Sequence, residues 1–320
     1  MPNIMKALVE ASNSAGGYLV PTEFSNRLLA LIQNKAVIMG DCDIRSMNAQ
    51  VKYIPTVTAG TTARWVAEVA TITASQTAYS RITLTAKKIA ALTEISTELL
   101  EDNNVDVADT LVDQMGNDIA LAIDLEMIEG TGGHFTGLRD TGSFANAVDA
   151  LGTINETGAD GTASALTGEQ ITVKAMQAAV GEILKDNHEQ PDVSYWNPKV
   201  LGQLQQLTDS TTRPVLNMET YGSPLLREGV TATLYGTKAK STSQLPVDLT
   251  YGTAAAQSGS CSDAIVARSK MHAIVGQRRG FIWKNDYVMA TDKYQYQTTM
   301  RLAFAIKYPD AYCMIRAIID

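Results

Sequence analysis

Alternation of hydrophobic and polar residues predicts strands in two separate parts of the chain. Residues 51–92 are rich in Val, Thr, Ile and Tyr, and apolar and polar side chains alternate from Arg81 to Ala86. Residues 263–319 show the same chemistry in several short runs. Because β-branched and aromatic residues favour a pleated, half-buried backbone, we expect extended strands in both parts.

The two strand-like arms of the first part enclose a segment of different character. Residues 56–80 are dense in Thr, Ala and Ser, and their only charged residues are Arg64 and Glu68. Because this segment contains too few large apolar side chains to bury itself, the pattern favours a hairpin that protrudes from the fold. The alternative is a hairpin that folds over its own core.

A helical pattern follows over residues 104–129. Asn104 is a favourable N-cap, acidic residues occupy the first turn, and Gly130 is a stop signal. The apolar positions at helical spacing are Leu111, Met115, Ile119 and Ala122. At 1.5 Å per residue the helix would be roughly 39 Å long, which predicts an element that can act as a spine.

Two shorter helices are predicted in the middle of the chain. Thr167 and Gln170 have the spacing of a capping box, which predicts a helix to about Lys185. A strand over 192–196 leads into a second helix over 198–207, so these two elements form a βα unit. The start signals of the second helix are Asn197, at the N-cap, and Pro198, at the first helical position.

Near the N-terminus, two glycines and a proline interrupt regular structure. Gly16, Gly17 and Pro21 surround three apolar residues. This composition predicts an extended arm that docks on another surface, and the alternative is a terminus that frays.

Composition excludes several classes of protein. The chain has 320 residues, which is enough for two packed units, and a net charge of −8. A negative chain disfavours a bulk electrostatic grip on DNA or an anionic membrane, and no apolar run reaches the roughly 18 residues of a membrane span. Cys42, Cys261 and Cys313 lie far apart with no CxxC pair, so we expect reduced core residues and no disulfide framework.

Charge is distributed unevenly. Residues 89–138 contain no Lys or Arg and many acidic residues, whereas residues 265–320 contain nine basic residues, including Arg278 and Arg279, against four acidic ones. Opposite charges in two regions can pair within a subunit or between copies, and the pattern leaves both open.

Motifs for catalysis or cofactor binding are missing from the sequence. His134, His188 and His272 are the only histidines, and none are paired at metal-ligand spacing. In the glycine-rich run after the long helical pattern, Phe135 stands where a dinucleotide-binding loop has its third glycine, and the run follows a helix instead of a strand. We therefore expect no cofactor, no metal site and no enzymatic activity.

Six motifs follow one another over almost the whole chain, from Gly16 to Ile319. In order they are GGYLVP, ARWVAE, TEISTELLEDNNVDV, LEMIEGTGG, YWNPKVLGQLQQLTD and MRLAFAIKYPDAYCMI. In this order and spacing they resemble the tailed-phage major capsid proteins, whose shell fold is named after phage Hong Kong 97. The resemblance implies an α+β fold with an N-arm, an extended E-loop β-hairpin, a peripheral domain around a long spine helix, and an axial domain. The implied bounds are 1–30 for the N-arm, 31–50 for the start of the peripheral domain, 51–88 for the E-loop, 89–150 and 285–308 for the peripheral domain, and 151–284 and 309–320 for the axial domain.

The resemblance also implies a structural, non-catalytic role. Copies would assemble as pentamers and hexamers, in the host cytoplasm, into the icosahedral capsid of a virion, with the E-loop of one copy over its neighbour's peripheral domain. The implied partners are other copies of the chain and a portal protein; double-stranded DNA would be enclosed without sequence-specific binding, and no membrane is involved. Because the scaffolding segment that some members carry before the arm is missing here, we expect a separate scaffolding protein, and the alternative is a mature form from which that segment has been removed. The candidate contact residues between copies are Gly16, Gly17, Pro21, Arg64, Trp65, Glu68, Arg81, Arg278 and Arg279.

One departure from the family changes an expectation. In the namesake shell a lysine of the E-loop is joined covalently to an asparagine of a neighbour, but residues 53–86 contain no lysine, so we expect no such crosslink. The main alternative is an encapsulin, a cellular compartment of the same fold that encloses cargo enzymes. A β-rich adhesin, which would be expected to have export signals, and an enzyme are more distant alternatives.

Overall fold

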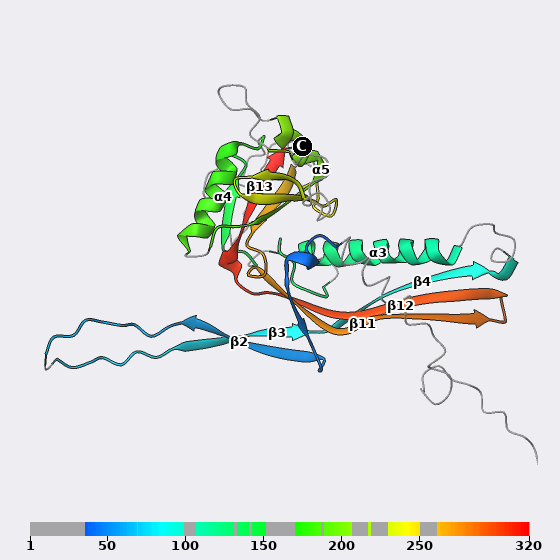
Figure 1. The fold of residues 1–320 in the computed structure, drawn as a ribbon, viewed down its shortest axis with the longest axis horizontal. Helices are drawn as coiled ribbons and strands as arrows, with labels where there is room; N and C mark the ends of the chain where they lie inside the picture. Colours follow the sequence, from blue (N-terminus) through cyan, green and yellow to red (C-terminus); the bar gives the residue numbers. More distant parts are fainter. Residues whose placement is uncertain are drawn as a thin grey trace, which may run out of the picture.

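The computed structural model describes residues 36–68, 70–98, 107–130, 133–140, 143–151, 170–186, 189–206, 217–218, 230–249 and 261–319. These residues form two β-sheets, a separate two-stranded hairpin, and helices beside the sheets (Figure 1). The predicted N-arm, with Gly16, Gly17 and Pro21, lies outside the described residues.

The first sheet has four strands in the order β1–β11–β12–β4. Their bounds are Asp43–Ser46 for β1, Lys87–Ser96 for β4, Ala273–Val288 for β11 and Lys293–Ile306 for β12. β4 and β11 both pair antiparallel with β12, and helix α3 (Val107–Glu129) runs alongside the sheet (Figure 1). The two parts of the chain that were predicted to form strands therefore meet in one sheet.

The second sheet has seven strands in the order β5–β13–β10–β6–β9–β8–β7. Their bounds are Asn146–Asp149 for β5, Val193–Trp196 for β6, Asn217–Met218 for β7, Val230–Leu234 for β8, Thr237–Ser241 for β9, Cys261–Ala267 for β10 and Tyr312–Ile319 for β13. Helices α4 (Val173–Lys185) and α5 (Pro198–Gln206) share a hydrophobic core with this sheet. The core includes Trp196 of β6 and Ile315 of β13.

The hairpin consists of β2 (Val51–Ala59) and β3 (Ala78–Thr85), which pair antiparallel. At its base Leu84 is fully buried, and Ile54 and Ile82 pack against a small core shared with the first sheet. Beyond this base the hairpin protrudes, at the left of Figure 1. The structure therefore has the protruding hairpin that the composition of residues 56–80 predicts.

Helix α3 lies where the long helix was predicted, but it buries a partly different set of side chains. Met115 and Ile119 are buried as expected, whereas Ala122 is exposed and Ile123 is buried in its place. The buried face of the helix also includes an acidic residue, Asp124.

Asp124 is stabilised on this buried face by backbone groups. Its carboxylate oxygens accept hydrogen bonds from the N–H groups of Val37, at 2.8 Å, and Ile38, at 3.4 Å. A buried polar group needs such partners, because an unsatisfied one costs about 1–3 kcal/mol. Removal from water still raises the pKa of Asp124 to about 7.

Helix α4 begins later than the capping-box pattern predicts, so that prediction was wrong for its start. The N-cap is Thr172, whose hydroxyl accepts a hydrogen bond from the N–H of Ala175 and donates one to the carbonyl of Ala150. These bonds fix the first turn at Val173, and Thr167 lies outside the described residues.

The βα unit before α5 is confirmed. Strand β6 ends at Trp196, and α5 starts at Pro198. The side-chain oxygen of Asn197 accepts a hydrogen bond from the N–H of Lys199 at 3.0 Å, as an N-cap does.

One hydrophobic core joins the two sheets. It contains Ile123 and Met127 from α3, Val275 from β11 and Met314 from β13. Residues 273–284, which the implied division gives to the axial domain, pair with β12 in the first sheet because β11 is one continuous strand. Conversely, β5 forms a parallel ladder with β13 in the second sheet, although the division gives it to the peripheral domain.

The glycine-rich run after α3 closes the end of that helix. Gly130 has a φ of 65°, and the N–H of Leu138 returns to the carbonyl of Met127 at 2.9 Å. A Cβ on Gly137 would lie 2.5 Å from the carbonyl oxygen of Ile128. Glycine is therefore needed at these positions because the backbone returns so close to the end of the helix that a side chain would not fit.

Candidate assembly surfaces

One face of the hairpin is left uncovered by the described residues. Tyr53, Val57 and Tyr79 lie on this face with exposed fractions of 58%, 58% and 72%, and Tyr79 stands opposite Val57 in the ladder. The guanidinium of Arg81 lies 4.7 Å from the centre of the Tyr53 ring, in a cation–π contact. Side chains on a strand alternate between faces, so the apolar side chains of the opposite face contact the first sheet while these remain in solvent.

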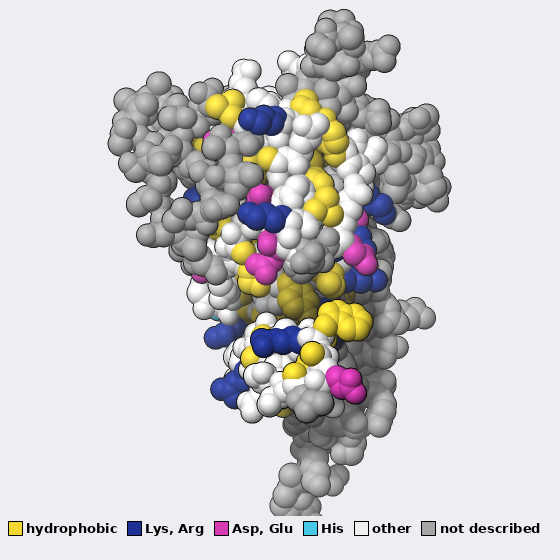
Figure 2. Space-filling model, turned by 90° about the vertical axis from the view of Figure 1, so that its left-hand side faces the viewer, with side chains coloured by type: hydrophobic (Ala, Val, Ile, Leu, Met, Phe, Trp, Pro, Cys, Tyr) yellow, Lys and Arg dark blue, Asp and Glu magenta, His cyan; other side chains and the backbone are white. Residues whose placement is uncertain are grey.

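The described residues of the hairpin tip, 60–68 and 70–77, have no strand pairing. The N–H of Thr62 donates to the hydroxyl of Ser75 at 2.9 Å. Trp65 is completely exposed, and Ile72 is 79% exposed. Seen end-on in Figure 2, the hairpin presents hydrophobic, basic and acidic side chains next to one another.

A pocket of about 470 Å³ lies between α3 and β4. Its rim includes Glu126, whose carboxylate accepts hydrogen bonds from the N–H groups of His134, at 2.8 Å, and Phe135, at 3.3 Å. The apolar side chains of the wall are Ile89, Ala122, Ile123, Leu125, Phe135 and Leu302, and the charged side chains include Lys87, Lys88 and Glu126. The pocket is therefore an apolar hollow with charges of both signs around it.

The far end of the first sheet is a third exposed surface. There the carboxylate of Asp292 accepts hydrogen bonds from the hydroxyls of Tyr287 and Thr97, both at 2.7 Å, and these bonds lower the pKa of Asp292. Met289, in the turn between β11 and β12, is 86% exposed. The turn is thus fixed to the end of β4 and presents an apolar side chain to solvent.

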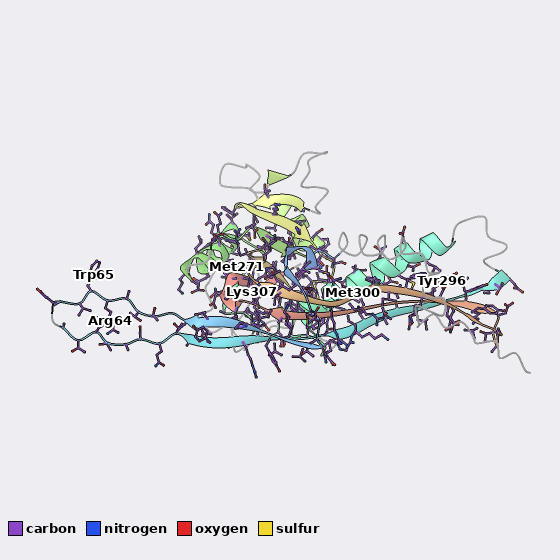
Figure 3. The ribbon with its side chains drawn as sticks, turned by 60° about the horizontal axis from the view of Figure 1, so that its bottom comes forward. Arg64, Trp65, Met271, Tyr296, Met300 and Lys307 are labelled. Carbon is purple, nitrogen blue, oxygen red and sulfur yellow. The ribbon has the colours of Figure 1, made fainter. Side chains whose placement is uncertain are left out.

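The predicted contact residues that the structure describes occupy three separate places. Arg64, Trp65 and Glu68 lie together at the tip, where Figure 3 labels the first two, Arg81 lies on the uncovered face, and Arg278 and Arg279 lie in β11. The guanidinium of Arg279 donates to the hydroxyl of Thr299 at 3.1 Å. Their role in contacts between copies stays a prediction.

Some of the opposite charges pair within the subunit. Arg139 forms ion pairs with Asp263, at 3.0 Å, and Glu129, at 3.2 Å. Lys293 on β12 lies 3.4 Å from Glu94 on β4. Of these three pairs, Lys293–Glu94 joins the basic region to the acidic region, so pairing within one chain accounts for a small part of the charge asymmetry.

Sequence reasoning missed a polar cluster at Asp41, between the two sheets. The hydroxyl of Tyr195 donates to this carboxylate at 2.8 Å, and Lys240 forms an ion pair with it at 2.9 Å. The backbone N–H of Lys270 donates to the carbonyl of Asp41 at 2.6 Å. These partners are 154 and more positions away in sequence, so no local pattern could have indicated the cluster.

Cys42, Cys261 and Cys313 are buried, as predicted. Burial raises the pKa of the Cys42 thiol and lowers the pKa of the buried His272 imidazole, so both groups are uncharged near neutral pH. Within the described part of the chain, no group of three or more His, Cys, Asp or Glu is placed to bind a metal ion. The described helices also include none that is both long and apolar enough to cross a membrane.

Comparison with known proteins gives a consistent result. Residues 16–316 match the family model described as the Phage capsid family. Similar solved structures include the capsid of a native GTA particle, which is 17% identical and has a TM-score of 0.66; the match covers 98% of this chain and 100% of the other. A structure from Microbacterium phage Oxtober96 is 14% identical and has a TM-score of 0.64, and the match covers 89% of this chain and 91% of the other. A structure from Mycobacterium phage Adephagia is 14% identical over 97% and 98% of the two chains, with a TM-score of 0.63. A search of curated proteins gave no match.

Proposed function

Because the chain belongs to the phage capsid family and is a capsid shell protein, we propose that it assembles as pentamers and hexamers into an icosahedral shell around double-stranded DNA. The shell would be that of a tailed phage, assembled in the host cytoplasm. The role is structural and needs no catalytic group or cofactor.

The observation that supports this proposal most directly is the uncovered face of the hairpin. Tyr53, Val57 and Tyr79 expose apolar surface on an element that has a core only at its base. Large apolar side chains grouped on one exposed face indicate an interaction site. A closed shell supplies the missing cover on every copy at once, because each hairpin meets an identical neighbour.

The parts of the fold are assigned by the same proposal. The hairpin β2–β3 with its tip is the E-loop, α3 is the spine helix, the first sheet belongs to the peripheral domain and the second sheet to the axial domain. In this assignment the Asp41 cluster lies at the junction of the two domains.

The expected partners are those that a shell around DNA needs. A net charge of −8 fits a shell that encloses DNA without binding it tightly or by sequence. We expect a scaffolding protein that directs assembly and a portal protein through which DNA enters. These partners are inferred from the family resemblance.

Electron cryomicroscopy of the purified recombinant chain tests the proposal. We expect closed particles with pentamers and hexamers, and particles from infected cells should contain DNA and one portal vertex. A chain that stays monomeric at all concentrations, with and without scaffolding protein, would contradict it. Particles that contain cargo enzymes bound by short peptides on the inner wall would indicate an encapsulin.

Denaturing gel electrophoresis of mature particles tests the expected absence of covalent links. Because residues 53–86 contain no lysine, we expect one monomer band. A ladder of covalent multimers would show that another pair of side chains forms the link.

A further inference from the structure

We propose that Trp65, at the hairpin tip of one copy, docks into the pocket between α3 and β4 of a neighbouring copy. This inference rests on the proposed function, because the neighbour must be present for the pocket to be filled. It names the residue and the receptor site of a contact that the family assignment leaves unspecified.

The tip has the properties of a docking group. Trp65 is completely exposed, and Val66 and Ile72 are exposed beside it, so the tip presents a small apolar knob. Tryptophan is enriched among the residues that contribute most to protein interfaces, since it removes a large apolar area from water. An indole at the end of a strand pair that has no core of its own can gain such cover only by contact.

The pocket has the properties of a receptor for that group. At about 470 Å³ it has room for an indole ring, and its wall combines aliphatic side chains with the ring of Phe135. Leu125, on the rim, is itself 37% exposed. Filling the pocket would remove apolar surface from water on both partners.

The charges of the two surfaces are complementary. Arg64 and Glu68 flank Trp65 in the tip, while Glu126 and the lysine pair Lys87 and Lys88 line the pocket. Arg64 can therefore meet Glu126 while Glu68 meets a lysine. Pairs of this kind contribute to register more than to affinity.

The tip cannot reach the pocket of its own chain. The ladder from Val51↔Thr85 to Ala59↔Ala78 keeps the hairpin extended, and Figures 1 and 3 show its tip pointing away from α3 and β4. A Trp65 side chain that fills this pocket must therefore come from another molecule, and in a shell the adjacent copy is the one present at every position.

Site-directed crosslinking of assembled particles tests the contact. We would introduce W65C together with A122C, since Ala122 lines the pocket and is exposed, and treat particles with a short bis-maleimide. We expect a shift on a denaturing gel from the monomer to dimers and higher multimers. The native cysteines are buried, and W65C alone and A122C alone should remain monomeric.

Two further variants test specificity. T83C/A122C keeps the pocket cysteine but moves the other to an exposed position near the base of the hairpin, and it should give no ladder. V20C/A122C tests whether the N-terminal segment fills the pocket instead. In a third variant, W65C/M289C, the second cysteine lies at the far end of the first sheet. The proposal would be overturned if W65C/A122C gave no ladder while V20C/A122C or W65C/M289C gave one.

Electron cryomicroscopy of wild-type particles gives a second, independent measurement. The map should show an indole in the pocket of every hexamer subunit, and W65A particles should lack it. If wild-type particles form and the pocket is empty in them, only the docking proposal fails. If wild-type chains form no particles, the proposed function fails and the docking proposal with it.

Discussion

Strands β10 and β2 are both extended segments of the chain, but their surroundings are opposite. Every residue of β10 (Cys261–Ala267) is buried, whereas none of β2 (Val51–Ala59) is. β10 pairs with strands on both sides, while β2 pairs only with β3. Hydrophobic patterning therefore predicts that a segment is extended, but it does not reveal whether the surface that covers it belongs to the same chain.

The sharpest test of this difference compares one buried and one exposed isoleucine. We expect I265A to lower the free energy of unfolding of the unassembled subunit by roughly 2–5 kcal/mol, because Ile265 is fully buried and its loss leaves a cavity. I72A, at the tip, should change it by no more than about 0.5 kcal/mol. Urea unfolding gives both values, and equal effects would show that the tip packs in solution.

A second test concerns charge inside the fold. The pKa of Asp124 is raised to about 7 from an ordinary 3.8, so folding favours its protonated form. The stabilisation from this group is fully present below pH 3.8 and is lost as the pH rises through 7. One pKa unit corresponds to about 1.36 kcal/mol, so between pH 4 and pH 8 the unfolding free energy of the wild type should fall by roughly 2–4 kcal/mol relative to that of D124N.

The measurement for Asp124 is the difference in unfolding free energy between D124N and wild type at each pH. Asparagine offers one acceptor oxygen for the N–H groups of Val37 and Ile38, so a constant offset is expected, and only its change with pH is diagnostic. E68Q, at the exposed tip, is the matched control for loss of a carboxylate. A pH-independent difference for D124N would contradict the raised pKa.

A third test removes the uncovered face of the hairpin. In Y53A/Y79A we expect the stability of the subunit to change little, whereas the critical concentration for assembly should rise about tenfold or more, which corresponds to 1.4 kcal/mol. Light scattering against concentration measures it. T83A, on the same face, is the control, and normal assembly of the double variant would show that this face stays in solvent.

The smallest expected effect belongs to the charges at the tip. R64A/E68A should weaken assembly more than it destabilises the subunit. We expect the free energy of assembly to change by up to about 1 kcal/mol for each ion pair lost, because exposed ion pairs contribute little. Shell yield over a salt series is the measurement. The same yield and the same salt dependence as wild type would show that both charges are solvated.

Local signals predicted the elements better than their surroundings. Asn197 and Pro198 predicted the start of α5 because an N-cap acts over only a few residues. The capping-box prediction at Thr167 failed because several Thr residues compete for that role, and Thr172 has a partner in Ala150 that the sequence does not reveal.

The assembly surfaces were predictable only in part. The shortage of large apolar side chains indicated a protruding tip with Arg64 and Trp65. The pocket could not be predicted, because its wall brings together β4, α3 and Leu302 of β12 from distant parts of the chain. The same holds for the partly buried Asp41 cluster.

The alternating faces of the hairpin have an evolutionary consequence. Even-numbered positions such as Ile54, Ile82 and Leu84 contact their own subunit, whereas odd-numbered positions such as Tyr53 and Tyr79 face outward. Among relatives of this chain, substitutions at the first set should covary with residues of the first sheet, and substitutions at the second set with the surface of the adjacent copy. A two-residue period in covariation would then record two selective pressures along one strand.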